Sequence, residues 1–363
     1  MRRLRASACL AAAAVAAGTA TAVAVPAEPH PPHVACSGNP AKPHRLDLSV
    51  EGTPTFGYYA VPAGRARGIV VFDHGYSHTA WNWREHLSQV AARDHVITIA
   101  MDYRFQHDSA IDPKTGLSSS RGWRVAEGAQ DSVAAAQLFD SRCHPGGVNT
   151  VYGISMGGNT SGLVVASQPK DAQGRPLFDY WFAVEPAVDV TETWAEASAV
   201  AQSGNEFAVS AVADIEEETG GTPADVPDAY RERSVVTRVS DIAGAGLRGV
   251  AVVQGVDDGL VPYNQSREIV AELRASGIPV DDVTVGTRGD GEAGTTASGY
   301  ALGPLGQESP FAGHASEVSN TQLVGSTGFD LLDRLYLHHD APGCRESFRD
   351  GDTGAWEVSP AAC

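Results

Sequence analysis

Residues 150–158 constrain the fold of this chain more than any other segment. They read Thr-Val-Tyr-Gly-Ile-Ser-Met-Gly-Gly, which predicts a short buried strand, a tight turn at Ser155 and a helix that begins at Met156. Gly153 and Gly157 stand where side chains would collide in such a turn. The turn therefore exposes the Ser155 hydroxyl, and the helix points its first N–H groups to where negative charge would develop.

Strand and helix patterns alternate along most of the remaining chain. Strands are predicted at 45–49, 55–61, 68–72, 95–101, 150–154, 180–184, 249–254 and, as the last strand, 280–285; helices are predicted at 81–92, 125–139, 156–168, 265–275 and 321–338. The first two strands are expected to form a hairpin at a sheet edge. The alternation of strand and helix predicts a mostly parallel sheet with helices on both faces.

Residues 187–245 interrupt this alternation, because they are acidic and helix-prone and lack a strand pattern. We interpret them as a helical cap inserted into the core. A glycine-rich loop, free of any clear pattern, follows at 286–313. The expected organisation is a signal peptide at 1–24, a flexible leader at 25–44, a core at 45–186 and 246–340, the cap at 187–245, and a tail at 341–363 tied down by a disulfide.

The first 24 residues have the three parts of a secretory signal. Three arginines among the first five residues precede an apolar stretch at 9–17, which is too short to span a membrane. Ala22-Val23-Ala24 offers a cleavage site. We therefore expect a secreted protein, cleaved near Ala24, without a stable membrane anchor. The paired arginines leave the export route open.

The chain is strongly acidic, with 44 acidic and 26 basic residues and a formal charge of −18. Loss of the N-terminal segment removes three arginines and no acidic residue, so the mature charge becomes 23 − 44 = −21. Such a surface repels phosphate backbones and anionic lipids, which excludes nucleic acid and anionic membranes as expected partners. The charge does not indicate an oligomeric state.

Four cysteines remain once Cys9 leaves with the signal: Cys36, Cys143, Cys344 and Cys363. An even number in an exported chain suggests two disulfides, for which three pairings are possible. We prefer Cys36 with Cys143 and Cys344 with Cys363, without a deduction that excludes the others. No cysteine or histidine spacing favours a zinc site, so no metal is expected.

Carboxylates and one histidine follow the predicted strands on the ligand-binding edge of the sheet. Asp257 and Asp258 come directly after the strand at 249–254 and compete for one role. Glu185 ends the strand at 180–184; it is an alternative acid, or it lines a pocket or caps a helix. His314 follows the last strand, in a loop where a lone histidine would otherwise be read as a surface residue.

The order Ser155, Asp257 or Asp258, His314, together with the His74-Gly75 loop, resembles the α/β-hydrolase superfamily over residues 45–340. Within it, the chain looks like a secreted serine esterase or lipase, although it lacks a His-Gly-Gly-Gly run. The resemblance implies the α/β-hydrolase fold. The two-residue spacing between Asp258 and Val261-Pro262 favours Asp258 as the acid.

The resemblance also implies an oxyanion hole formed by the backbone N–H groups of Met156 and Tyr76. Ser155 would attack a carbonyl while His314 takes its proton and Asp258 orients the imidazole. Water would then hydrolyse the acyl-enzyme. This chemistry requires no metal or organic cofactor.

The expected activity is hydrolysis of a small-molecule or polymeric carboxylic ester. A peptidase or amidase could use the same triad, with Glu216, Glu217 and Glu218 of the acidic cap binding a basic group. An acyltransferase would pass the acyl group to an alcohol instead of water. An inactive binding protein is disfavoured because every catalytic element is present.

Overall fold

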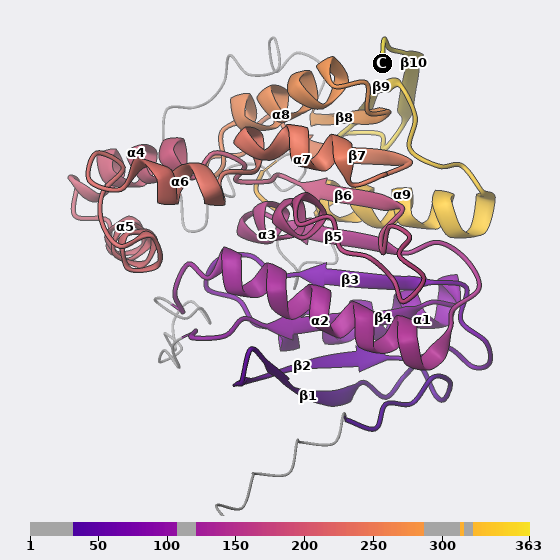
Figure 1. Ribbon diagram of the computed structural model, residues 1–363. Helices are drawn as coiled ribbons and strands as arrows, with labels where there is room; N and C mark the ends of the chain where they lie inside the picture. Colours follow the sequence, from indigo (N-terminus) through magenta and orange to yellow (C-terminus); the bar gives the residue numbers. More distant parts are fainter. Residues whose placement is uncertain (1–31, 107–120, 287–312, 316–321) are drawn as a thin grey trace, which may run out of the picture. The chain divides into compact units, whose positions relative to one another are not determined.

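The computed structural model describes residues 32–106, 121–286, 313–315 and 322–363. A ten-stranded sheet with the order β1-β2-β4-β3-β5-β6-β7-β8-β9-β10 forms the centre of residues 32–363 (Figure 1). The strands are β1 (His44–Val50), β2 (Thr53–Ala60), β3 (Ile69–Asp73), β4 (Ile97–Asp102), β5 (Thr150–Ile154), β6 (Tyr180–Val184), β7 (Gly249–Gly255), β8 (Val280–Gly286), β9 (Arg345–Asp350) and β10 (Trp356–Pro360).

The strands from β4 to β9 in this order run parallel, and β1, β2 and β10 are antiparallel additions at the two edges. Every residue of β3, β5 and β6 is buried, because helices cover both faces of the sheet. The mostly parallel sheet and the hairpin at its edge are therefore confirmed.

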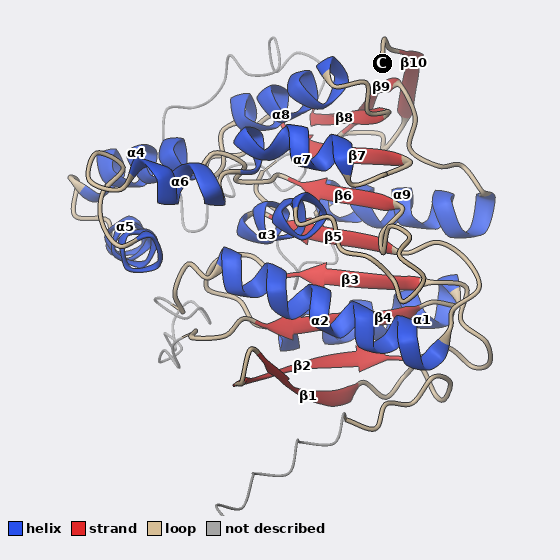
Figure 2. Ribbon diagram, viewed as in Figure 1, coloured by secondary structure: helices blue, strands red, loops and turns tan. Residues whose placement is uncertain are grey.

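Two helix layers sandwich this sheet. Figure 2 shows α2, α3, α7 and α8 over one face and α1 and α9 over the other. Their bounds are α1 (Arg84–Asp94), α2 (Val125–Cys143), α3 (Met156–Ala166), α7 (Val239–Gly244), α8 (Tyr263–Ala275) and α9 (Leu323–His338). Each face of the sheet has its own apolar core, one against α2 and α3 and the other against α1 and α9.

The regular elements between β6 and β7 are all helices, joined by short loops. It contains α4 (Val190–Ala201), α5 (Glu206–Thr219), α6 (Pro227–Arg233), a 3₁₀ turn at Val235–Arg238 and α7. The last of these packs against α3 in the helix layer. Figure 1 places α4, α5 and α6 beyond the carboxyl ends of the parallel strands. From here on, the cap means these three helices, whereas the cap expected from the sequence, 187–245, also included the 3₁₀ turn and α7.

The C-terminal tail corrects one expectation, because β8 is not the last strand. β9 pairs parallel to β8, and β10 turns back beside it. The sequence Arg-Glu-Ser-Phe-Arg-Asp of β9 hides this strand, because its charged side chains do not form an apolar run. Arg345 instead binds the buried carboxylate of Asp281 on β8, which compensates both charges.

Two disulfides join the pairs that we preferred. Cys36 bonds to Cys143 at the end of α2, and Cys344 bonds to Cys363. The Cα–Cα distances of 5.2 and 5.4 Å lie within the range usual for disulfides. The predicted signal peptide, the start of the leader and most of the loop at 286–313 lie outside the described residues. None of the helices in the described ranges combines the length and apolarity that a bilayer-spanning helix needs.

Candidate active site

The turn at Ser155 has the geometry that the glycines predict. β5 ends at Ile154, α3 begins at Met156, and Ser155 between them has φ 58° and ψ −125°. A side chain on Gly153 would overlap the carbonyl group of Gly157, and one on Gly157 would overlap the backbone of Asp73. Such strained backbone persists only where close packing enforces it, and it is typical of functional sites.

The predicted acid and base meet at the carboxyl end of the sheet. Nδ1 of His314 lies 2.8 Å from Oδ2 of Asp258, and both residues are buried. The other oxygen of Asp258 accepts the backbone N–H groups of Leu260 and Val261 at 2.8 and 2.9 Å. Because a carboxylate only accepts, Nδ1 carries the proton and Nε2 is left to act as a base. It is therefore Asp258, and not Asp257, that pairs with His314.

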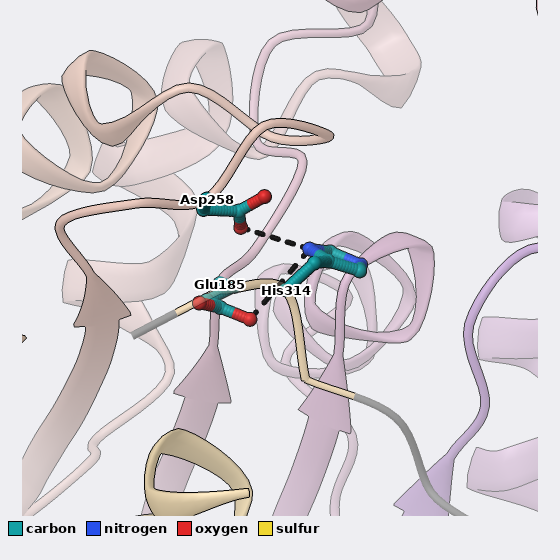
Figure 3. Close-up of side chains that lie close together, drawn as sticks. All are labelled: Glu185, Asp258 and His314. Carbon is teal, nitrogen blue, oxygen red and sulfur yellow. Dashed lines mark hydrogen bonds and ion pairs between the residues drawn. The ribbon is translucent and has the colours of Figure 1, made fainter. Parts of the chain in front are cut away.

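Glu185 lies beside this pair without replacing Asp258. Figure 3 shows both carboxylates directed at one nitrogen of His314, with Oε2 of Glu185 3.6 Å away. Glu185 accepts the backbone N–H of Gly255 at 3.1 Å and that of Ala315. It therefore links the ends of β6 and β7 to the residue that follows His314.

Burial raises the pKa of Glu185 well above its ordinary value, and the negative charge of Asp258 raises it further. This shift favours the protonated form of Glu185 beside Asp258 and His314. Among the described residues, Glu185, Asp258 and His314 are the one group of side chains that could hold a metal ion, with ligand atoms within 4.8 Å. The hydrogen bond between Asp258 and His314 matches an acid–base pair instead.

The predicted oxyanion loop packs against the first turn of α3. Gly157 lies against the carbonyl groups of Asp73 and His74, which brings this loop next to Met156. The His74 ring does not take part in the triad. It stacks on Tyr103 with ring centroids 4.0 Å apart, and the Tyr103 hydroxyl donates to the His74 carbonyl at 3.0 Å.

Ser155 opens into an apolar cavity between the core and the cap. The cavity measures about 60 Å³, room for about four water-sized groups. Its lining residues come from the elbow, the oxyanion loop, the segment before α2, the loops after β6 and β7, and the cap: Tyr76, Trp123, Ser155, Ala187, Thr193, Glu196, Ala197, Val200, Phe207, Ala208, Ala211, Gly259, Leu260 and Val261. The sequence analysis placed two of these residues at the site, Tyr76 and Ser155. It missed the cap residues, because they belong to no recognisable motif.

The acidic run of the cap is occupied by contacts within the protein. Glu216 accepts the indole N–H of Trp194 at 3.0 Å, and Glu217 pairs with Arg124. Glu218 accepts the backbone N–H of Ala126 at 3.0 Å. Burial raises the pKa of the Glu218 carboxyl group to about 7. These contacts hold the cap to itself and to α2, whereas the sequence suggested that the three acids could bind a basic substrate.

Residues 127–289 match the prolyl oligopeptidase family, Peptidase_S9. No curated protein was found to match by sequence. Among solved structures, an esterase named rPPE, in complex with (S)-Ac-CPA, is similar at TM-score 0.53 and 14% identity, covering 80% of each chain. One of two fungal esterases from Rhizomucor miehei is similar at TM-score 0.52 and 14% identity, covering 81% of this chain and 83% of that chain.

An acylaminoacyl peptidase from Pyrococcus horikoshii has TM-score 0.47 and 14% identity, covering 66% of this chain and 36% of that one. The strand order and the elbow at Ser155 are those of the fold that the two esterases share. The likeness at this level of identity concerns the fold. The elbow, the sheet and the two esterase structures together show that the chain has the α/β-hydrolase fold, and the family match over residues 127–289 supports a hydrolase of the serine type.

Proposed function

We propose that this protein is a secreted serine hydrolase that cleaves carboxylic esters with a short apolar acyl group. One observation carries the proposal: the hydrogen-bonded pair of Asp258 and His314 lies at the sheet edge where Ser155 opens into an apolar cavity. A nucleophile next to an acid-oriented base is the arrangement that acyl transfer requires.

In the proposed mechanism, Nε2 of His314 takes the proton of the Ser155 hydroxyl as its oxygen attacks the ester carbonyl. Asp258 keeps Nδ1 protonated and stabilises the imidazolium that forms. The backbone N–H groups of Met156 and Tyr76 stabilise the oxyanion, each contributing about 3 kcal/mol to the transition state. His314 then protonates the leaving alcohol and activates the water that hydrolyses the acyl-enzyme.

The cavity supports an ester with a small acyl group as substrate. Its walls are chiefly alanine, valine, leucine and aromatic side chains, and its volume of about 60 Å³ suits a few carbon atoms. Two solved structures of similar fold at TM-scores above 0.5 are described as esterases, which agrees with this choice.

A peptidase or amidase is the second candidate, because residues 127–289 match the prolyl oligopeptidase family. The engagement of Glu217 and Glu218 with α2 weighs against recognition of a free amine by these side chains. The secreted location rests on the signal-like first 24 residues and on the two disulfides, which persist in oxidising compartments.

A fluorophosphonate probe tests the serine directly. We expect the secreted protein to be labelled and the Ser155→Ala variant to remain unlabelled. Labelling that survives in this variant would refute the assignment. A panel of p-nitrophenyl acetate, butyrate and octanoate beside aminoacyl anilides then tests the substrate class. We expect the short esters to be turned over fastest, and turnover of anilides alone would replace the esterase by the peptidase.

A further inference from the structure

Tyr76 connects the oxyanion loop to the cap. Its hydroxyl donates to Oδ2 of Asp214 on α5 at 2.5 Å, and both side chains are more than nine-tenths buried. Its ring packs edge-on against Phe207 of the same helix, with ring centroids 5.3 Å apart. The residue that is expected to supply a backbone donor to the oxyanion is thus held by its side chain from across the cavity.

The helix that holds Tyr76 is itself docked on the core. Asp214, Glu217 and Glu218 are spaced at i, i+3 and i+4, so they lie on one face of α5. Glu217 pairs with Arg124, and Glu218 accepts the backbone N–H groups at the start of α2. The acidic face of α5 therefore binds the core at two places, the start of α2 and the oxyanion loop.

We propose that Asp214 is a positioning residue for the oxyanion hole, which keeps the backbone N–H of Tyr76 aligned only while α5 is docked. The inference rests on the proposed function, because it takes Tyr76 as an oxyanion donor. A hydrogen bond to a carboxylate is about twice as strong as a neutral one, which suits a residue that must hold a loop in register. The cap then contributes to catalysis as well as to the shape of the cavity.

The expected kinetic effect follows from when the donor acts. An oxyanion donor binds the transition state more strongly than the substrate, so its misplacement lowers kcat and leaves KM largely unchanged. A displacement of about 1 Å can reduce the rate about 100-fold. A residue that only shaped the cavity would change KM and the preference for acyl length instead.

The test compares Tyr76→Phe, Asp214→Ala and the double variant with p-nitrophenyl butyrate as substrate. Alanine removes the acceptor, whereas asparagine would keep an oxygen that can accept from the Tyr76 hydroxyl. We expect each single change to lower kcat by about 10- to 100-fold with KM within about twofold. The double variant should be no slower than the slower single variant, because both changes remove the same bond. Asp228→Ala is the matched control: Asp228 pairs with Arg231 on the exposed side of the cap, and its variant should match the wild type.

Unchanged kcat in Asp214→Ala would overturn the inference, and so would kcat losses that multiply in the double variant. In either case the proposed function stands as long as the wild-type protein is labelled by the fluorophosphonate. A wild-type protein that is not labelled would overturn both. Thermal unfolding of each variant is measured beside the kinetics. If Asp214→Ala does not fold, Tyr76→Phe decides alone, because it removes one hydroxyl and keeps the ring against Phe207.

Discussion

Asp258 and Glu185 approach the same nitrogen of His314, with carboxylate oxygens 2.8 and 3.6 Å from Nδ1. Asp258 makes the hydrogen bond, and Glu185 instead accepts the backbone N–H groups of Gly255 and Ala315. Asp258 orients the imidazole, and Glu185 holds the loop that carries His314. The two roles can be separated by substitution.

Replacement of the predicted acid tests the first role. Asp258→Asn should lower kcat by about 10³- to 10⁴-fold, because the amide can donate to Nδ1 and favour the wrong imidazole tautomer. Asp257→Asn is the matched control and should retain wild-type turnover of p-nitrophenyl butyrate. The opposite result would show that the acid lies one position earlier.

Loss of the Asp258 charge should also change Glu185. Burial and that charge together raise the pKa of Glu185, so in Asp258→Asn its pKa moves back toward the ordinary value and a negative charge 3.6 Å from Nδ1 becomes less costly. We expect Asp258→Asn with Glu185→Gln to be about tenfold slower than Asp258→Asn alone. Equal rates for these two variants would exclude Glu185 as a reserve acid.

Gly157 tests the contact between the elbow and the oxyanion loop. A methyl group at this position would overlap the Asp73 carbonyl and crowd that of His74, so Gly157→Ala should displace the loop and reduce kcat at least 100-fold. Gly343→Ala is the control, because a methyl group there meets no atom within 4 Å. Wild-type kinetics in Gly157→Ala would show that this packing does not position the oxyanion hole.

The buried carboxyl group of Asp73 should make the free energy of unfolding depend on pH. It is fully buried, and burial raises its pKa from 3.8 to about 8 although Ser132 donates to it. The folded state thus holds a proton that the unfolded state releases near pH 4, so ionisation favours unfolding as the pH rises from about 4 to about 8. Asp73→Asn removes this contribution.

The measurement is the free energy of urea unfolding at several pH values. Relative to the wild type, Asp73→Asn should become progressively more stable between pH 5 and pH 8, by an amount on the order of a few kcal/mol. Its Oδ1 can still accept from Ser132, so the substitution keeps that hydrogen bond. A constant difference between the two proteins across this range would contradict a buried neutral Asp73.

The sequence by itself determined the parts of this protein that depend on local pattern. Mainly apolar runs predicted β3, β5 and β6, and glycines beside Ser155 predicted the strained turn, because these features need only neighbouring residues. The order of Ser155, Asp258 and His314 predicted an acid–base pair that the structure brings to 2.8 Å. Parallel strands end at one edge of the sheet, so such an order already implies proximity.

The tertiary structure decided what depends on contacts between distant segments. Glu185 binds the backbone of the residue after His314 and so supports that loop. The pair of Arg345 and Asp281 lets the charged segment β9 join the sheet. The acidic side chains of α5 dock the cap on the core. A charged residue looks alike in sequence whether it faces solvent, a partner or a substrate. Burial and the partner it meets decide its role, and both arise only when the chain is folded.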